Sequence, residues 1–142
     1  MRVLSSFRRI LVEPALRRRA LVVALYGLLS PLPLVGTLGY ESSLVTTAPM
    51  SLLGIGAGVD AMRAARAAAA DATTEDGASP LRTAGPAMLR EVLILAGLAL
   101  ATLLLAQLWN PTCEPLEGLE FFALGPALSA ALGGACGLGK SV

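Results

Sequence analysis

Four stretches of the chain lack acidic and basic residues and are long enough to cross a membrane as helices: 20–40, 42–59, 92–109 and 121–139. A helix needs about 20 apolar residues to cross the ~30 Å hydrocarbon core of a bilayer. The pattern therefore predicts an all-α membrane protein, a bundle of four transmembrane helices in one domain, 20–142. For the second stretch, which glycine, serine and threonine dilute, the alternative is a re-entrant hairpin or a buried soluble helix.

Proline and glycine subdivide these stretches. Proline lacks a backbone N–H and disfavours helix in the residue before it, so each internal proline predicts a helix break. The predicted breaks are at Pro31, Pro33, Pro49 and Pro126. The second and fourth stretches also carry small residues at four-residue spacing, which lets helices approach closely. The predicted packing positions are Gly54, Gly58, Ser129, Gly133 and Gly137, used within the bundle or against another subunit.

Two segments lie outside the predicted spans. In 1–19, apolar residues recur at helical spacing between arginines, which indicates a basic amphipathic helix on the inner leaflet or, alternatively, a frayed tail. The second segment, about 60–91, begins as an alanine-rich helix that continues the second span. Asp76-Gly77, Ser79-Pro80 and Gly85-Pro86 are breaker signals, so 73–87 is predicted to be a flexible cytoplasmic connection.

Charge sets the predicted orientation. All eleven basic residues fall on one side of a four-span arrangement, whereas the opposite loops, 39–42 and 110–120, carry only acidic charges. By the positive-inside rule both termini are cytoplasmic and the protein is a multi-pass protein of the plasma (inner) membrane. An uncleaved signal-anchor helix is favoured over a cleaved signal peptide. Aromatic residues lie at the predicted outer ends, where rings favour the interface: Tyr40, Trp109, Phe121 and Phe122.

Composition agrees with a lipid environment and argues against catalysis. The chain is 55 % hydrophobic and 15 % charged, and it has no histidine. The commonest general base is thus missing, and no predicted span contains a charged residue. We therefore expect no enzyme activity, no catalytic residue and no cofactor. Nucleic-acid binding is not expected either, because the basic residues lie near the membrane without interleaved aromatic residues.

Near the C-terminus, Gly134 to Ser141 fits the phosphate-loop pattern G-x-x-x-x-G-K-[ST]. Such a loop needs a strand before it and a helix after it, so that backbone N–H groups converge on the phosphates. Here the preceding residues are alanine-rich and helix-like, and only Val142 follows. We interpret the match as the inner end of a membrane helix, with Lys140 as an interfacial anchor, and expect no nucleotide binding.

The acidic outer loop could in principle bind a divalent cation through Cys113, Glu114, Glu117 and Glu120. The same residues equally describe a solvated turn before a helix N-terminus, where acidic side chains are favoured. We therefore predict no metal site. Cys113 and Cys136 are at opposite ends of the fourth span and cannot pair with each other. An intermolecular disulfide through Cys113 stays open, and Cys136 is interpreted as a small packing residue.

Small-residue packing faces are plentiful in this chain, and functional polar groups are scarce. This contrast favours a small, non-catalytic subunit or accessory component of a membrane transport or envelope assembly. Its expected partners are the lipid bilayer and a membrane protein or a second copy of the chain. The alternative is a small transporter or permease-type module for a neutral solute, in which the proline breaks expose backbone carbonyls at mid-membrane.

Overall fold

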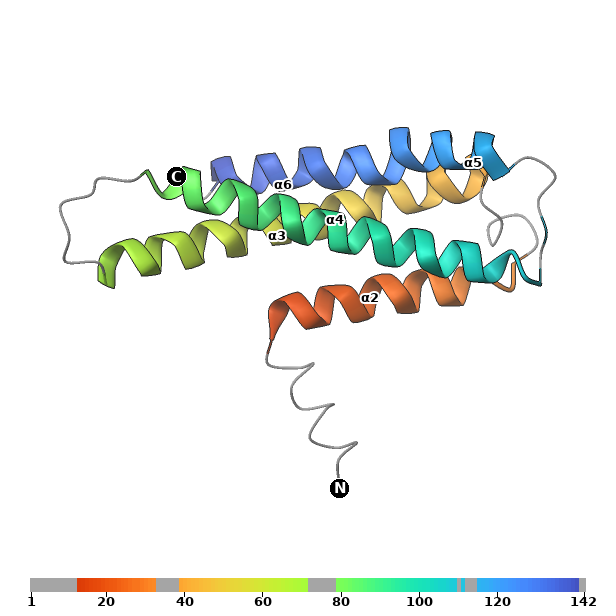
Figure 1. Cartoon of the computed structure of the whole chain (residues 1–142), viewed down its shortest axis with the longest axis horizontal. Helices are drawn as coiled ribbons and strands as arrows, with labels where there is room; N and C mark the ends of the chain where they lie inside the picture. The colour runs from red at the N-terminus through yellow and green to blue at the C-terminus, as the bar shows by residue number, and fades with distance from the viewer. Residues whose placement is uncertain (1–12, 33–38, 72–78, 110, 112–114, 141–142) are drawn as a thin grey trace, which may run out of the picture.

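A computed structural model of the chain describes residues 13–32, 39–71, 79–109, 111 and 115–140. Every regular element in these ranges is a helix (Figure 1). In chain order they are α2 (Pro14–Leu29), α3 (Tyr40–Asp71), α4 (Pro80–Ala106), α5 (Pro115–Phe122), the π-helical turn η1 (Ala123–Ala127) and α6 (Leu128–Lys140). The last three follow one another without interruption and form one long helix.

Three helical segments are long and apolar enough to cross a membrane: Tyr40–Ala70, Pro80–Ala106 and Leu116–Gly139. The fourth helix, α2, has 16 residues and is not among them. In the described part of the first predicted span, α2 ends at Leu29. The last helical hydrogen bond runs from the Ser30 N–H to the Tyr26 carbonyl, 2.9 Å away, and the helix ends there because Pro31 has no N–H to continue the series. Residues 33–38, including Pro33, lie outside the described residues.

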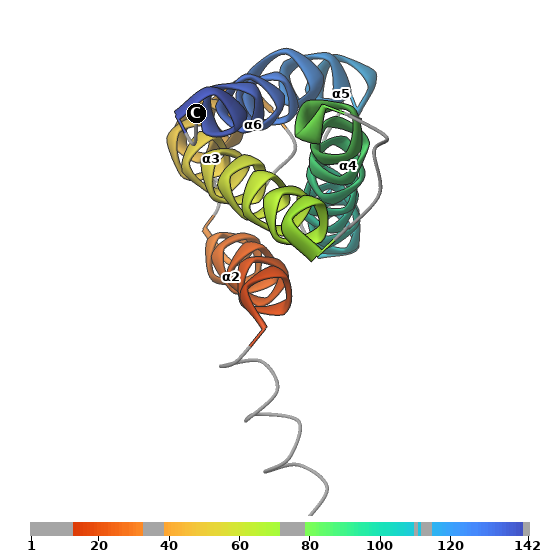
Figure 2. The same cartoon turned by 90° about the vertical axis from the view of Figure 1, so that its left-hand side faces the viewer.

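The long helices form a three-sided bundle. Figure 2, viewed along the bundle, shows α3, α4 and α6 around a triangle, with α2 outside it. The helices α3 and α6 run parallel and in close contact, whereas α4 runs antiparallel to both (Figure 1). The N-terminal helix α2 packs mainly on α4 and touches α3. Since α2 makes so much less contact with α3, its position depends on α4 and on the polar contacts described below.

The core contains a few large side chains from all the helices. Tyr26, Met50 and Leu95 are fully buried, and the ring of Phe122 meets that of Tyr26 edge to face at 6.5 Å. Phe122 was expected at the membrane interface, but it is only 5 % exposed because it turns inward onto α2. Trp109, by contrast, is 76 % exposed at the end of α4.

Proline has a different effect at each predicted break. The helix α3 continues through Pro49, so the break predicted there is wrong. Just before it, the hydroxyls of Thr46 and Thr47 donate to the carbonyls four residues earlier, at 2.6 Å each, and packing on α6 supports the same turn. Pro126 lies in the π-helical turn, which widens the helix there without ending it.

The segment predicted as a loop, 60–91, is helical at both ends. The helix α3 extends to Asp71, and α4 begins at Pro80, so the flexible connection was predicted too long. Proline is tolerated in the first helical turn, where the N–H has no partner, and Pro80 occupies that position. Pro86 lies further inside α4 but is exposed, so water can solvate the carbonyl that it leaves unpaired. Residues 72–78 lie outside the described part of the chain.

Candidate functional site

Two arginines at the start of α2 bind carboxylates on α3 and α4. Arg18 Nη1 forms an ion pair with Asp60 Oδ2, and Arg63 Nη1 lies 3.9 Å from Asp60 Oδ1. Arg19 contacts Glu91 twice, through Nε to Oε1 at 3.2 Å and through Nη2 to Oε2 at 2.5 Å. We call these five residues the ionic layer. It joins three helices at one level of the bundle.

The ion pairs of this layer are partly shielded from water. The side chains of Arg18 and Glu91 are each only 12 % exposed, and a charge in such a place is costly unless it is paired. Arg19 and Glu91 meet through two parallel hydrogen bonds, the strongest geometry for this pair. The hydrogen bond to Glu91 raises the pKa of the Arg19 guanidinium, against a smaller opposing effect of burial. Arg19 therefore stays charged at any physiological pH.

Gly56 provides the space for the Arg18 side chain. A Cβ atom at Gly56 would lie 3.6 Å from Arg18 Cδ and 3.8 Å from Arg18 Nη1, which is ordinary contact. The aliphatic stem of Arg18 thus runs along the backbone of α3 while its guanidinium reaches Asp60. A side chain larger than alanine at Gly56 would meet this stem.

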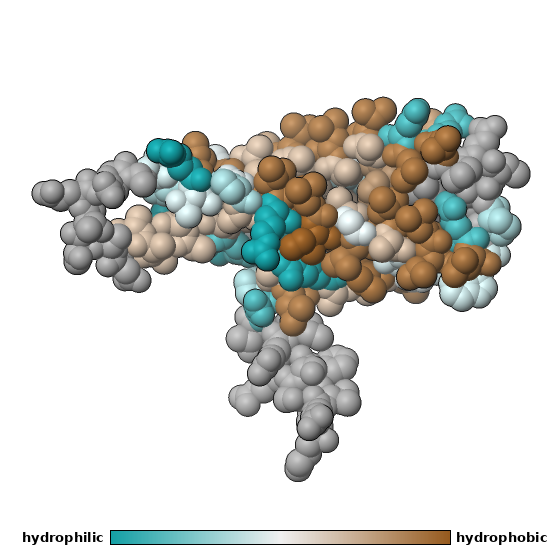
Figure 3. All heavy atoms as spheres, viewed as in Figure 1, coloured by the Kyte–Doolittle hydropathy of each residue, from teal (hydrophilic) through white to brown (hydrophobic). Residues whose placement is uncertain are grey.

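The ionic layer lies at one boundary of the apolar part of the bundle. Between Glu41 and Asp60, α3 has no charged residue, and these 18 positions span about 27 Å as a helix, close to the hydrocarbon thickness. In α4 no charged residue follows Glu91. Figure 3 shows the same arrangement: a teal band over α4 and the start of α2, with brown, apolar surface on one side of it.

Small residues bring α3 and α6 into backbone contact. At four glycines, an added Cβ would overlap a carbonyl oxygen of the facing helix. The facing pairs are Gly54 with Ala130, Gly58 with Gly134, Gly133 with Ser51, and Gly137 with Ile55. We call this contact the glycine seam. The pairs form two rows, 54–130 with 58–134 and 51–133 with 55–137, and within each row the numbers on both helices rise by four because the helices are parallel. Such proximity permits weak Cα–H···O contacts.

Ser129 extends the glycine seam toward the end of the bundle that lies away from the ionic layer. Its hydroxyl lies 3.1 Å from the carbonyl oxygens of Thr47 and Pro126, so it donates to α3 or to its own helix. The structure thus brings all five predicted packing residues into the α3–α6 contact inside one chain. They are therefore occupied and are not exposed for contact with another subunit.

A cluster of hydroxyl groups is buried near the N-terminal end of α3. Ser42, Ser43 and Thr46 are buried there, as is Tyr26 of α2. Thr46 approaches the Tyr26 hydroxyl but donates to the Ser42 carbonyl. By distance and angle, the hydroxyls of Tyr26 and Ser43 have no hydrogen-bond partner in the part of the chain that the structure describes. Such groups are costly in an apolar interior and attract polar ligands or water.

The remaining candidate residues are the phosphate-loop match, the two cysteines and the acidic residues of the outer loop. Gly134 to Lys140 are helical in α6, which is not the loop geometry of a phosphate site. Cys136 was interpreted as a packing residue, but it is exposed, because it lies on the face of α6 opposite the glycine seam. Cys113 and Glu114 lie outside the described residues. Among those that are described, no three His, Cys, Asp or Glu residues are grouped as metal ligands.

Sequence reasoning missed the ionic layer. It used the basic residues, Arg18 and Arg19 among them, only to predict orientation, and it assigned no role to Asp60 or Glu91. A signal was present, since Asp60 follows the second apolar stretch directly and Glu91 precedes the third directly. Two acids and two bases at the same predicted depth on neighbouring helices are expected to pair, because an unpaired charge there is costly.

Comparisons of the chain with protein-family models, with curated proteins and with solved structures found no match. Function is therefore inferred from the surfaces and contacts described above. Two of them, the ionic layer and the glycine seam, hold the helices of this chain together. The surfaces of α2 and α4 that face away from the bundle are exposed and apolar.

Proposed function

We propose that this chain is a non-catalytic subunit or accessory component of a membrane transport or envelope assembly. The three long apolar helices support membrane insertion. The ionic layer and the glycine seam support a structural role, because the charged and small residues that they contain serve to join helices. A subunit of an assembly also needs a surface through which it contacts its partner.

The exposed face of α4 offers that surface and is the observation that carries the proposal. This helix is the most apolar of the three candidate spans, yet only 28 % of its most apolar stretch is buried, against 39 % in the other two. Gly97 lies on the exposed face with nothing within 4 Å of an added Cβ, and Ala101 follows one turn later. Leu93 and Leu104 flank them. The four-residue spacing of Gly97 and Ala101 is the small-residue spacing that lets a partner helix approach closely.

The proposed topology is a four-span bundle in the plasma (inner) membrane with both termini cytoplasmic. In it, α2 begins the first crossing and runs antiparallel to α3. The ionic layer lies at the cytoplasmic boundary, and the basic residues Arg66 and Arg82 lie on the α3 and α4 extensions beyond it. The positive-inside rule favours this orientation.

Purification in a mild detergent tests the function. Wild-type protein should copurify with partner membrane proteins, and Gly97→Leu or Ala101→Leu should lose them. Gly27→Leu is the matched control, because Gly27 is also an exposed membrane-level glycine with nothing within 4 Å of its Cβ, but lies on α2. A wild-type protein that elutes alone, or a Gly97→Leu variant that keeps its partners, would refute the proposal. Glycine-seam variants are unsuitable here because they disturb the chain itself.

The second candidate is a permease-type module for a small neutral solute. The buried hydroxyl of Ser43 favours it, since it has no hydrogen-bond partner among the described residues and could bind a polar, uncharged molecule. The π-helical turn η1 lies beside this part of α3, and such turns are frequent at functional sites. Glycerol or urea flux into proteoliposomes should then fall in Ser43→Ala, and flux equal to that of empty liposomes would exclude this activity.

A further inference from the structure

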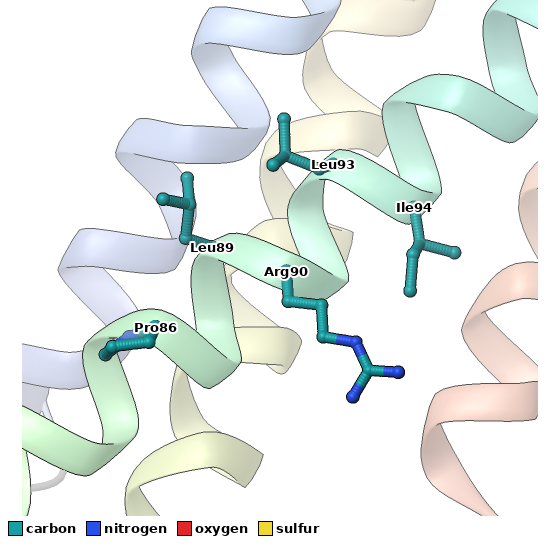
Figure 4. A pocket seen from close by; sticks show the side chains of 5 residues that line it. All are labelled: Pro86, Leu89, Arg90, Leu93 and Ile94. Atoms are coloured by element: carbon teal, nitrogen blue, oxygen red, sulfur yellow. The ribbon is translucent and has the colours of Figure 1, made fainter.

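Two grooves open on the side of α4 that faces away from the bundle. The first, of about 440 Å³, is formed by one helix and is shown in Figure 4. It is lined by Pro86, Leu89, Arg90, Leu93 and Ile94. The second, of about 530 Å³, lies between α2 and α4 and is almost entirely apolar. It is lined by Leu16, Arg19, Ala20, Val23, Ala24 and Leu98.

The two grooves lie one helical turn apart along α4, and together we call them the combined groove. Arg90 and Ile94 line the first and Leu98 lines the second, and these residues follow one another at four-residue steps on one helix face. Each step advances about 6 Å along the helix. The combined groove begins with a cation beside Glu91, at the level of the ionic layer, and continues along apolar side chains toward mid-membrane.

Arg90 differs from the arginines of the ionic layer. Its side chain is exposed, and no acidic side chain in the described ranges forms an ion pair with it. In Figure 4 its guanidinium projects away from α4 on the side where α2 lies, as Ile94 does one turn further along. Arg90 is thus a free cation at the apolar boundary, at the entrance of an apolar groove.

We propose that an anionic phospholipid occupies this groove, with its phosphate on Arg90 and an acyl chain along Ile94 and Leu98 against α2. Guanidinium groups bind phosphate oxygens through charge-assisted hydrogen bonds. Basic pockets between membrane helices at the cytoplasmic side are suited to anionic headgroups.

A lipid fits better than a peptide helix. A partner helix would need an acidic residue at the depth of Arg90, whereas every phospholipid of that leaflet carries its phosphate there. The polarity of the groove also changes as a lipid requires, from an entrance that carries Arg90 to an almost entirely apolar part between α2 and α4. This inference requires membrane insertion but not the partner surface around Gly97, so either can fail alone.

Lipid titration followed by native mass spectrometry tests the inference on the full chain in a neutral detergent. Wild-type protein should bind phosphatidylglycerol more tightly than phosphatidylcholine, and inorganic phosphate should not displace the lipid. Arg90→Gln should weaken phosphatidylglycerol binding about fivefold, the effect of one basic residue near a membrane surface. Arg82→Gln is the matched control, because Arg82 is an exposed arginine of the same helix that lines neither groove. It should bind like wild type.

The apolar half of the groove is tested separately with Ala24→Trp, which fills that half without changing the charge. Ala24 is exposed, so the variant should fold, and it should weaken phosphatidylglycerol binding while Arg90 is intact. Equal loss in Arg90→Gln and Arg82→Gln would show diffuse attraction to basic residues and overturn the proposal. Equal binding of the two lipids, or unchanged binding in Ala24→Trp, would also overturn it.

Discussion

Replacing Gly58 with alanine should destabilise the protein relative to the same replacement at Gly97. In a helix, alanine is favoured over glycine by about 0.5–1 kcal/mol, and this gain applies at both positions. At Gly97 the new methyl group meets nothing within 4 Å, so the gain is kept in full. At Gly58 it overlaps the Gly134 carbonyl oxygen and lies 3.0 Å from the Leu138 nitrogen.

Those neighbours of Gly58 are backbone atoms, which cannot rotate away as a side chain does. The helices α3 and α6 must therefore separate, and overpacking of this kind costs about 1–3 kcal/mol. Because the helix-propensity gain cancels between the two variants, the difference in their free energies of unfolding isolates this steric cost. We expect Gly58→Ala to be less stable than Gly97→Ala by about 1–3 kcal/mol.

Unfolding by sodium dodecyl sulfate in mixed micelles, followed by far-UV circular dichroism, measures this difference. Wild type should unfold between the two variants or close to Gly97→Ala. Gly54→Ala should behave like Gly58→Ala, since its methyl group overlaps the Ala130 carbonyl oxygen. If the Gly58 and Gly97 variants unfold at the same detergent fraction, the backbones of α3 and α6 do not touch at Gly58, and the parallel packing described above is wrong.

Four further predictions follow from the ionic layer and the cysteines. In the same assay, Arg19→Gln and Glu91→Gln should each cost about 1–2 kcal/mol, less than a fully buried pair because Arg19 is 36 % exposed, and the double variant should cost less than their sum. A raised pKa means that the contribution of Arg19 to stability is fully present below its ordinary pKa and is lost only as the pH rises through the higher folded pKa. Unfolding between pH 7 and 10 should therefore show no dependence on Arg19. Gly56→Leu should displace the arginine stem packed on it and make α2 more accessible to protease, whereas Gly56→Ala should not. Impermeant thiol reagents added to intact cells should label Cys113 and spare Cys136, and permeabilisation should then expose Cys136; the reverse order would contradict the proposed orientation.

The sequence was informative where one physical requirement dominates. Length and lack of charge predict helices at 42–59, 92–109 and 121–139. The first and last of these stretches lie wholly in helices long enough to span, and 92–106 of the middle one lies in a third. Glycines at four-residue spacing marked close packing in the second and fourth stretches. Spacing alone left open whether Gly54 and Gly58 face another subunit, because it does not show which helix lies opposite.

The remaining features depend on tertiary contacts that one segment does not reveal. Pro49 and Pro31 have the same local effect, but α3 is supported by α6 and continues, whereas α2 ends. The pairing of Arg19 with Glu91 joins residues 72 positions apart, and the chain order alone does not place α2 beside α4. Phe122 was expected at the interface from its position in the chain. Its ring instead packs edge to face on the ring of Tyr26 in the core.

The glycine seam restricts how this protein could recover from mutation. A second-site substitution restores a crowded interface by shortening the opposing side chain, but at Gly58 the opposing atom is a carbonyl oxygen, which no substitution removes. Gly134 is different, because an added Cβ there meets the Met88 Sδ atom, the flexible end of a side chain. A genetic screen should therefore return suppressors of Gly134→Ala at Met88, whereas Gly58→Ala should yield only revertants.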